Sequence, residues 1–286
     1  MSVEVITPSG VDKYLNKLFE GMPFQTYIDL EGFIHSSDLK LLQQSINHWL
    51  SKSDYAETHA LKLGTLGHTL LLEMDKLTER YLVMPKVDAR TVKGKEQKLL
   101  AEEQAQNEGK ILISQEDLTQ ALGWRENIMK NPVTSSVFMD SRGKNEVSGF
   151  FKHPEFDGIN AAFRVDKLLE KEKIAIDLKI MQSAHPFAFA SSVRKFRYDL
   201  QAAFYLTGLR EITGDDYDFL FVVCEKSNPH NVQTYRLDEE SLEVAREHIR
   251  VIISKYLEYK ESDEHQQNRL SGYYDGIQTL NIQWFN

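Results

Sequence analysis

The sequence predicts a mixed α/β fold, in which helices flank a central mixed β-sheet. Three observations support this class: a helical N-terminal part, three short extended segments in succession, and a later alternation of helices and strands. The predicted strands cover 146–152, 160–166, 173–179, 217–224 and 232–237, with turn residues between them. A helix over 187–207 separates the third and fourth strands, and a final helix begins after Asp238 and runs to about Tyr259.

The first 130 or so residues are predicted to be mostly helical. Ser36 or Ser37 caps a helix whose apolar residues fall on one face. A second helix over 61–73 is expected to break or kink near Gly64 and Gly67. Residues 91–109 are highly polar and form either an exposed helix or a mobile loop. The segment 114–117 resembles a capping box, which predicts a helix to about residue 130.

Length and composition indicate a globular protein with a large core. The chain has 286 residues, of which 41% are hydrophobic and 27% are charged. We expect a helical region over 1–140, a catalytic core over 141–260 and a tail over 261–286, which together could form one continuous domain. The tail is polar at first and then alternates Leu280, Ile282 and Trp284, a pattern that suits an edge strand or a contact with a neighbouring subunit.

Charge and cysteine content exclude several classes of site and partner. The net charge of −9 argues against a protein that coats DNA through a generally basic surface, so any DNA contact must be local. The single cysteine, Cys224, excludes a disulfide framework and a Cys-based zinc or iron–sulfur site within the chain. No apolar run reaches the roughly 18 residues of a membrane span, and the N-terminus lacks a signal-peptide pattern, so we expect a cytoplasmic protein without membrane contact.

The strongest local signal is the run Ile174–Lys179. Side chains alternate along a strand, so Asp177 and Lys179 share one face while the apolar residues between them share the other. Charges on a buried strand are costly unless they pair or bind a metal. Asp177 is therefore a candidate metal ligand and Lys179 a candidate for orienting or deprotonating the attacking water. Taken alone, the Asp-x-Lys motif is nonspecific, and an ion pair at the end of a strand explains it better.

Asp166 strengthens the metal interpretation. It ends the preceding strand, and antiparallel pairing through the turn 170–172 would bring it beside Asp177. Two carboxylates together with phosphate oxygens suit Mg²⁺, and Mn²⁺ is expected to substitute for it. The alternative for Asp166 is an ordinary turn residue at a strand end.

Two upstream residues are weaker candidates for the same site. His68 lies in an otherwise apolar helix, where a neutral imidazole could bind a metal or simply hydrogen-bond inside the core. Glu146 opens the first predicted strand and is either an additional acidic group or a surface residue.

The helix after the third strand carries polar and basic residues at helical spacing. Arg194, Tyr198, Gln201 and Tyr205 are spaced by four, three and four residues, which places them on one face. Arg194, Lys195 and Arg197 form the densest basic cluster in the chain, so Arg194, Lys195, Arg197 and Tyr198 are candidate DNA contacts. A solvated helix face is the alternative.

In this order and spacing, the segments between about 60 and 260 resemble the PD-(D/E)XK nuclease superfamily. They are most similar to the exonuclease VIII (RecE-like) group, which is related to the RecB nuclease domain and lambda exonuclease. The matching residues are Gly64 with His68, Glu146, Arg164-Val165-Asp166, Asp177-Leu178-Lys179 and the run Tyr198–Tyr205. Val165 replaces a proline common in the family, Asp177 is an allowed variant of the second acid, and Ile180–Ser183 lacks a frequent threonine pair.

The resemblance implies a restriction-endonuclease-like core and a specific set of roles. It implies metal ligation by His68, Asp166, Asp177 and the Leu178 carbonyl, with Lys179 acting on the water and Gln201 and Tyr205 completing the catalytic group. It also implies processive 5′ to 3′ digestion of double-stranded DNA from an end, a ring-shaped homo-oligomer and a single-strand annealing recombinase as partner, as in phage-type homologous recombination. An endonuclease and a catalytically silent DNA-end-binding recombination protein are the alternatives.

Overall fold

The computed structural model describes residues 8–52, 58–88, 90–139 and 142–273, and its centre is a seven-stranded mixed sheet. The strands follow the order β1-β5-β6-β7-β8-β9, with β2 paired to β6. Their bounds are β1 (Lys17–Phe19), β2 (Ile34–His35), β5 (Lys144–Lys152), β6 (Asn160–Leu169), β7 (Ile174–Met181), β8 (Asp218–Glu225) and β9 (Val232–Tyr235). The mixed α/β class is therefore confirmed, and two of the seven strands, β1 and β2, come from the region expected to be helical.

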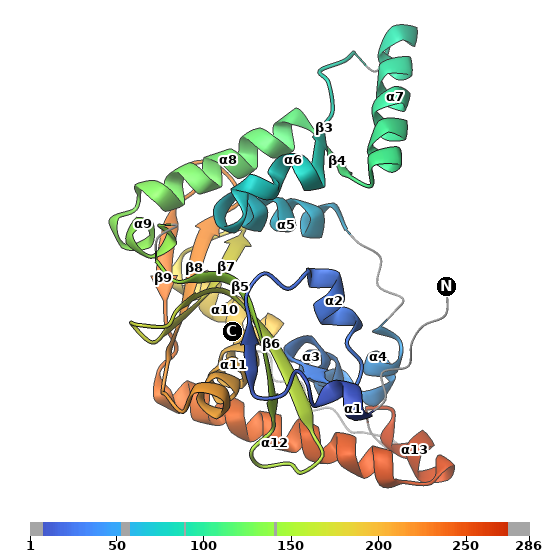
Figure 1. Cartoon of the computed structure of the whole chain (residues 1–286), viewed down its shortest axis with the longest axis vertical. Coiled ribbons are helices and arrows are strands. Elements are labelled where there is room, and N and C mark those ends of the chain that lie inside the picture. The colour runs from blue at the N-terminus through green and yellow to red at the C-terminus, as the bar shows by residue number, and fades with distance from the viewer. Residues whose placement is uncertain (1–7, 53–57, 89, 140–141, 274–286) are drawn as a thin grey trace, which may run out of the picture.

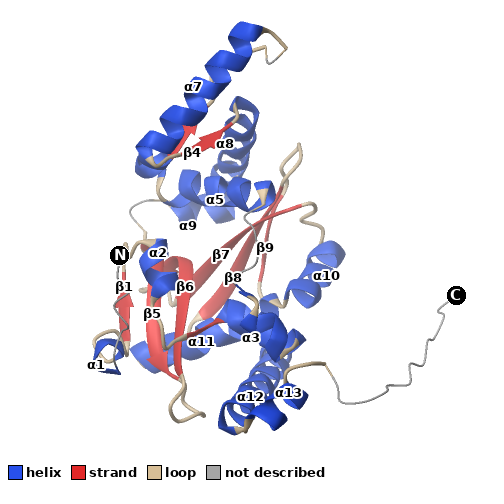
Figure 2. Ribbon diagram, turned by 90° about the vertical axis from the view of Figure 1, so that its right-hand side faces the viewer, coloured by secondary structure: helices blue, strands red, loops and turns tan. Residues whose placement is uncertain are grey.

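Helices cover both faces of this sheet (Figures 1 and 2). One face packs against α3 (Ser36–Gln44), α10 (Pro186–Phe196), α11 (Tyr198–Thr213) and α12 (Glu239–Glu261). The other face packs against α5 (His59–Leu72), α8 (Gln115–Lys130) and α9 (Pro132–Phe138). The shorter helices are α1 (Pro8–Val11), α2 (Phe24–Asp29), α4 (Ile46–Leu50), η2 (Met74–Lys76), α6 (Leu77–Arg80) and α13 (Glu264–Leu270).

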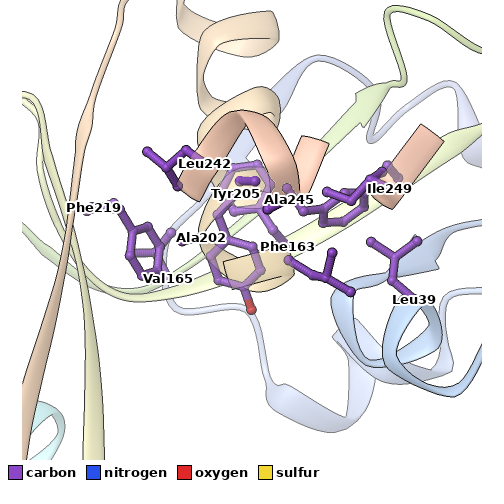
Figure 3. Close-up of a cluster of buried hydrophobic side chains, with 14 of the residues drawn as sticks. Leu39, Phe163, Val165, Ala202, Tyr205, Phe219, Leu242, Ala245 and Ile249 are labelled. Carbon is purple, nitrogen blue, oxygen red and sulfur yellow. The ribbon is translucent and has the colours of Figure 1, made fainter. Parts of the chain in front are cut away.

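The alternation of β7 divides its side chains between two cores. Ala175 lies in the cluster beneath α11, whereas Ile176 and Leu178 lie in the cluster beneath α5 and α8. Figure 3 shows part of the first cluster, where Phe163 and Tyr205 pack among side chains of α11 and α12. Burying apolar side chains on both faces fixes the strand and so fixes where Asp177 and Lys179 point.

A small unit stands away from the body of the molecule. Strands β3 (Tyr81–Val83) and β4 (Ile111–Ile113) pair in parallel, and α7 (Val92–Glu108) connects them. Both views show α7 projecting beyond α8 (Figures 1 and 2). Of the two alternatives for the polar segment, the structure shows the exposed helix, and the capping box at Ser114 is confirmed at the start of α8.

Three expectations about element boundaries are wrong. The helix over 187–207 is two helices, because Arg197 adopts a left-handed backbone with φ of 53° and turns the chain between α10 and α11. The helix expected to break near Gly64 and Gly67 is continuous as α5; a Cβ at Gly67 would lie 3.1 Å from the Trp124 ring, so this glycine permits close packing of α8. The last strand ends at Tyr235, not at 237.

The edge of β6 opposite β5 is shared by two strands and leaves a gap between them. Near its start, β6 pairs with β2 at Ala161 and Ala162. Near its end, it pairs with β7 only from Lys167 to Leu169. Continuing that register would place Asp166 opposite Asp177, but the ladder ends one pair earlier. The strands therefore separate where the two predicted carboxylates face each other.

Residues 1–7 and 274–286 lie outside the described residues, and so does the predicted pattern at Leu280, Ile282 and Trp284. Within the described ranges, no helix combines the length and the hydropathy needed to cross a membrane.

Two helical glycines provide a matched test of this packing. A Cβ at Gly208 of α11 would lie 2.5 Å from Phe163 and 2.6 Å from Phe151, whereas a Cβ at Gly64 of α5 meets nothing within 4 Å. We expect Gly208→Ala to lower the free energy of unfolding by about 1–3 kcal/mol through overpacking. Gly64→Ala should be neutral or raise it by up to about 1 kcal/mol through helix propensity. Urea unfolding measures both, and equal effects would contradict the packing described here.

Candidate active site

The site is built around Asp166, at the point where β6 and β7 separate. Its Oδ2 accepts a hydrogen bond of 2.6 Å from the Leu178 amide, so the carboxylate replaces a backbone partner that the ended ladder does not supply. Its Oδ1 lies 3.5 Å from Nδ1 of His68, which α5 brings from the other side of the gap. Asp166 is thus held between the sheet and α5.

His68, Glu146 and Asp166 form a compact group of candidate metal ligands. Each offers one ligand atom, and these atoms all lie within 4.8 Å of one another. Glu146 stands opposite Asp166 in the β5–β6 register, between the pairs Asn145–Lys167 and Val147–Val165. The structure therefore brings the weakest of the predicted acidic groups directly beside the first aspartate.

The backbone of Glu146 has an unfavourable conformation in this position. Its φ is 52°, a left-handed value that a residue with a Cβ adopts only under constraint, and such strain is often found at functional sites. Its Oε2 lies 2.6 Å from Nε of Arg164, whose Nη1 also donates to the Met22 carbonyl and to the Ser148 hydroxyl. The guanidinium therefore fixes one carboxylate oxygen of Glu146 and compensates part of its buried charge.

Asp177 and Lys179 form a second group on the opposite side of Asp166. The two side chains make an ion pair of 2.6 Å, and both contact Gln201 of α11. Gln201 donates to Asp177 Oδ1 and accepts from Lys179 at 3.3 Å, so one amide orients both charges. Asp177 Oδ2 is buried and accepts no well-aligned hydrogen bond from the described residues, its contact being the ion pair.

Lys40, which was not among the residues predicted from the sequence, lies on α3 next to this second group. Its ammonium lies 3.5 Å from the same Gln201 oxygen and 5.2 Å from the centre of the Tyr198 ring. Lys179 lies over that ring as well, at 4.4 Å. The one available signal was a lysine beside the core leucine Leu39 of the predicted helix, which does not by itself indicate a site.

Burial and the mixture of charges shift the pKa values of these groups. Burial would lower the pKa of His68, but the Asp166 carboxylate outweighs it and raises that pKa to about 9. Burial would raise the pKa of Asp166, yet His68 and Lys179 hold it below its usual value. Burial and the neighbouring Asp166 raise the pKa of Glu146. Such perturbation of several adjacent groups is typical of functional sites.

The other predicted site residues lie differently. Arg194 and Lys195 are exposed on α10, while Arg197 is bound to Asp199 at 2.9 Å and to His248 at 2.8 Å. The predicted helix face shared by Arg194, Tyr198 and Gln201 is therefore wrong, because Arg194 lies on α10 and the other two lie on α11. Tyr205 packs in the core against Phe163 and Phe219, and burial raises its pKa to about 12.

The donor set fits a hard divalent cation. Two carboxylates and one imidazole converge, and a third carboxylate, Asp177, lies beyond them. Carboxylate oxygens suit Mg²⁺ and Mn²⁺, and clustering them in a buried place is costly without a neutralising charge. His68, Glu146 and Asp166 would hold such an ion with Asp177 beside it.

Metal binding at this group should stabilise the protein. At a free Mn²⁺ concentration about 100 times the dissociation constant, we expect a gain of about 2.7 kcal/mol in the free energy of unfolding. Asp166→Asn retains the acceptor for the Leu178 amide but removes the charge, so the gain should largely disappear. Asp157→Asn, in the loop between β5 and β6, should keep it. Thermal unfolding with and without metal measures this, and identical gains in both variants would rule out Asp166 as a ligand.

The Lys40 ammonium should reduce stability at neutral pH. Burial and the adjacent Lys179 lower its pKa from 10.5 to about 8 in the folded protein. The unfolded chain then binds more protons between these values, so stability rises with pH over the window from 8 to 10.5. We expect the stability of the wild type to rise relative to Lys40→Met between pH 7 and 10.5. The control variant Lys152→Met removes an exposed lysine at the end of β5 that lies far from the site. The stability of the wild type relative to this variant should not rise over the same pH range.

The chain matches a model of a known protein family. A family model described as "PDDEXK-like domain of unknown function (DUF3799)" matches residues 34–272. A comparison with curated protein sequences finds no match.

Solved structures show a related fold. A protein from Eubacterium rectale named "Putative exonuclease" aligns over 93% of this chain and 97% of its own, with a TM-score of 0.60 and 14% identity. An alkaline exonuclease from Laribacter hongkongensis aligns over 83% of this chain and 97% of its own at 11% identity, but its TM-score of 0.30 carries no weight. The family model covers most of the chain, and the protein therefore belongs to the PDDEXK-like family DUF3799 of the PD-(D/E)XK nuclease superfamily.

Proposed function

We propose that this protein is a metal-dependent nuclease that degrades linear double-stranded DNA from an end. One observation carries the proposal: Asp166 lies between a group of metal-ligand type, His68 and Glu146, and the buried Asp177–Lys179 pair. An ordinary strand-end ion pair does not explain a second and a third buried acid beside it. The same arrangement offers a cation site, which suits metal-assisted phosphodiester hydrolysis, and an amine next to it.

Each side chain has a distinct role in this proposal. His68, Glu146, Asp166 and Asp177 would hold Mg²⁺ or Mn²⁺, and such an ion would supply activation of water and neutralisation of the charge that develops on the phosphate. Lys179 keeps its proton because Asp177 compensates its burial, so it orients the water or neutralises phosphate oxygens. Gln201 keeps Asp177 and Lys179 in register through its two hydrogen bonds.

Two similarities support the exonuclease form of this activity. The ordered motifs resemble the exonuclease VIII group, and the protein from Eubacterium rectale that shares the fold bears an exonuclease name. By the same resemblance we propose 5′ to 3′ polarity, a ring-shaped homo-oligomer and a single-strand annealing recombinase as partner. Arg194 and Lys195 remain proposed DNA contacts, since both are exposed on α10.

The function is tested on DNA of defined ends. The protein is incubated with linear duplexes labelled at either end and with covalently closed circles, in Mg²⁺ and in EDTA. We expect degradation of linear DNA in Mg²⁺, intact circles, and early release of the 5′ label. Cleavage of circles would establish an endonuclease instead, and DNA binding without any product would establish a silent end-binding protein.

Removing the amine should stop the chemistry without stopping metal binding. Lys179→Met retains the apolar stem and all four carboxylate or imidazole groups, so it should lose about 10²–10⁴-fold in rate while keeping the stabilisation by Mn²⁺. Lys152→Met removes one exposed lysine and should cleave at the wild-type rate. Wild-type cleavage by Lys179→Met would contradict the role assigned to this residue.

A further inference from the structure

Lys40 supplies a second ammonium group to the site. It lies on α3 and is not one of the residues that match the nuclease motifs. Its Nζ and that of Lys179 lie 3.5 and 3.3 Å from the same oxygen of Gln201. Both also face the Tyr198 ring, at 5.2 and 4.4 Å from its centre. Two like charges that share one neutral oxygen and one ring repel each other in a poorly solvated place.

The two lysines differ in their counter-charges. Lys179 pairs with Asp177 at 2.6 Å, whereas Lys40 makes no ion pair with any carboxylate in the described residues. The nearby carboxylates, Asp177 and Asp199, are already paired with Lys179 and Arg197. An ammonium that is largely withdrawn from water and lacks a counter-ion is unfavourable. One more negative charge beside Lys40 would therefore stabilise the site.

The topology explains why Lys40 is placed here. Strand β2 occupies the edge of β6 next to the gap, and α3 begins directly after β2 at Ser36. Packing of Leu39 and Leu42 in the core beneath α11 fixes α3 in that position. Asp38 holds the start of α3 by accepting from the His35 amide at 2.9 Å. Lys40 is therefore held rigidly on the α11 side of the site, opposite His68 on α5.

We propose that Lys40 binds a phosphate group of the DNA strand, beside the phosphate that is cut. The inference rests on the proposed function, since it takes the same strand as ligand. A phosphodiester oxygen supplies the negative charge that the described residues do not, and a lysine binds it as a compact point charge. The cut strand would then be bound on its α5 side by the ion held by His68, Glu146 and Asp166. On its α11 side it would be bound by Lys40.

The salt dependence of DNA binding tests this proposal. Fluorescence anisotropy with a labelled duplex is recorded against NaCl concentration in Ca²⁺, with a gel to verify that the DNA stays intact. We expect Lys40→Met to weaken binding about tenfold or more and to reduce the slope of log Kd against log salt by about one. Lys40→Arg should retain the wild-type slope, because it keeps the charge. Lys152→Met, the matched loss of an exposed lysine, should also retain it.

Three outcomes would overturn the proposal. A wild-type slope in Lys40→Met would show that no phosphate contact was lost, and an equal loss in Lys40→Met and Lys40→Arg would show a structural role. Absence of any DNA binding by the wild type would remove the ligand itself. Urea unfolding at pH 7 verifies that Lys40→Met is folded. Whether the wild type degrades DNA in Mg²⁺ is measured separately, so failure of the nuclease function and failure of the Lys40 contact give different results.

Discussion

The separation of β6 from β7 is the constraint on which the rest of the site depends. A continued ladder would bury Asp166 and Asp177 as a directly opposed pair of like charges, which is unfavourable. Because the ladder ends at Lys167–Ile176, the Asp166 carboxylate can accept a hydrogen bond from the Leu178 amide. The Leu178 N–H group therefore keeps a partner. The gap also lets residues from both faces of the sheet meet, since His68 comes from α5 and Gln201 from α11.

The site stores unfavourable interactions that the surrounding core must offset. Glu146 has a left-handed backbone, the carboxylates of Glu146 and Asp166 lie close together, and two ammonium groups share one amide oxygen. Each would be selected against in a protein that needed only stability. Glu146 and Asp166 gather with His68 on the α5 side, whereas the ammonium groups of Lys40 and Lys179 lie on the α11 side with Asp177. Such a division matches a cation and a phosphate better than it matches any internal pairing.

Patterns of short range were predictable from the sequence, and contacts of long range were not. Strand alternation places Asp177 and Lys179 together, and the tight turn before β7 predicts that Asp166 approaches them. The left-handed Arg197 leaves no trace in helical periodicity, so the break between α10 and α11 was missed. Lys40 was missed because a two-residue strand, β2, positions it, and so short a strand has no recognisable pattern. Glu146 was only a weak candidate because its partner, Arg164, lies on another strand.

The most direct test of the central claim is anomalous diffraction from a crystal that contains Mn²⁺. We expect a peak within coordination distance of His68, Glu146 and Asp166, with Asp177 beside it and Lys179 turned toward the same space. A manganese ion bound only at exposed carboxylates elsewhere, with these side chains directed away from one another, would contradict it.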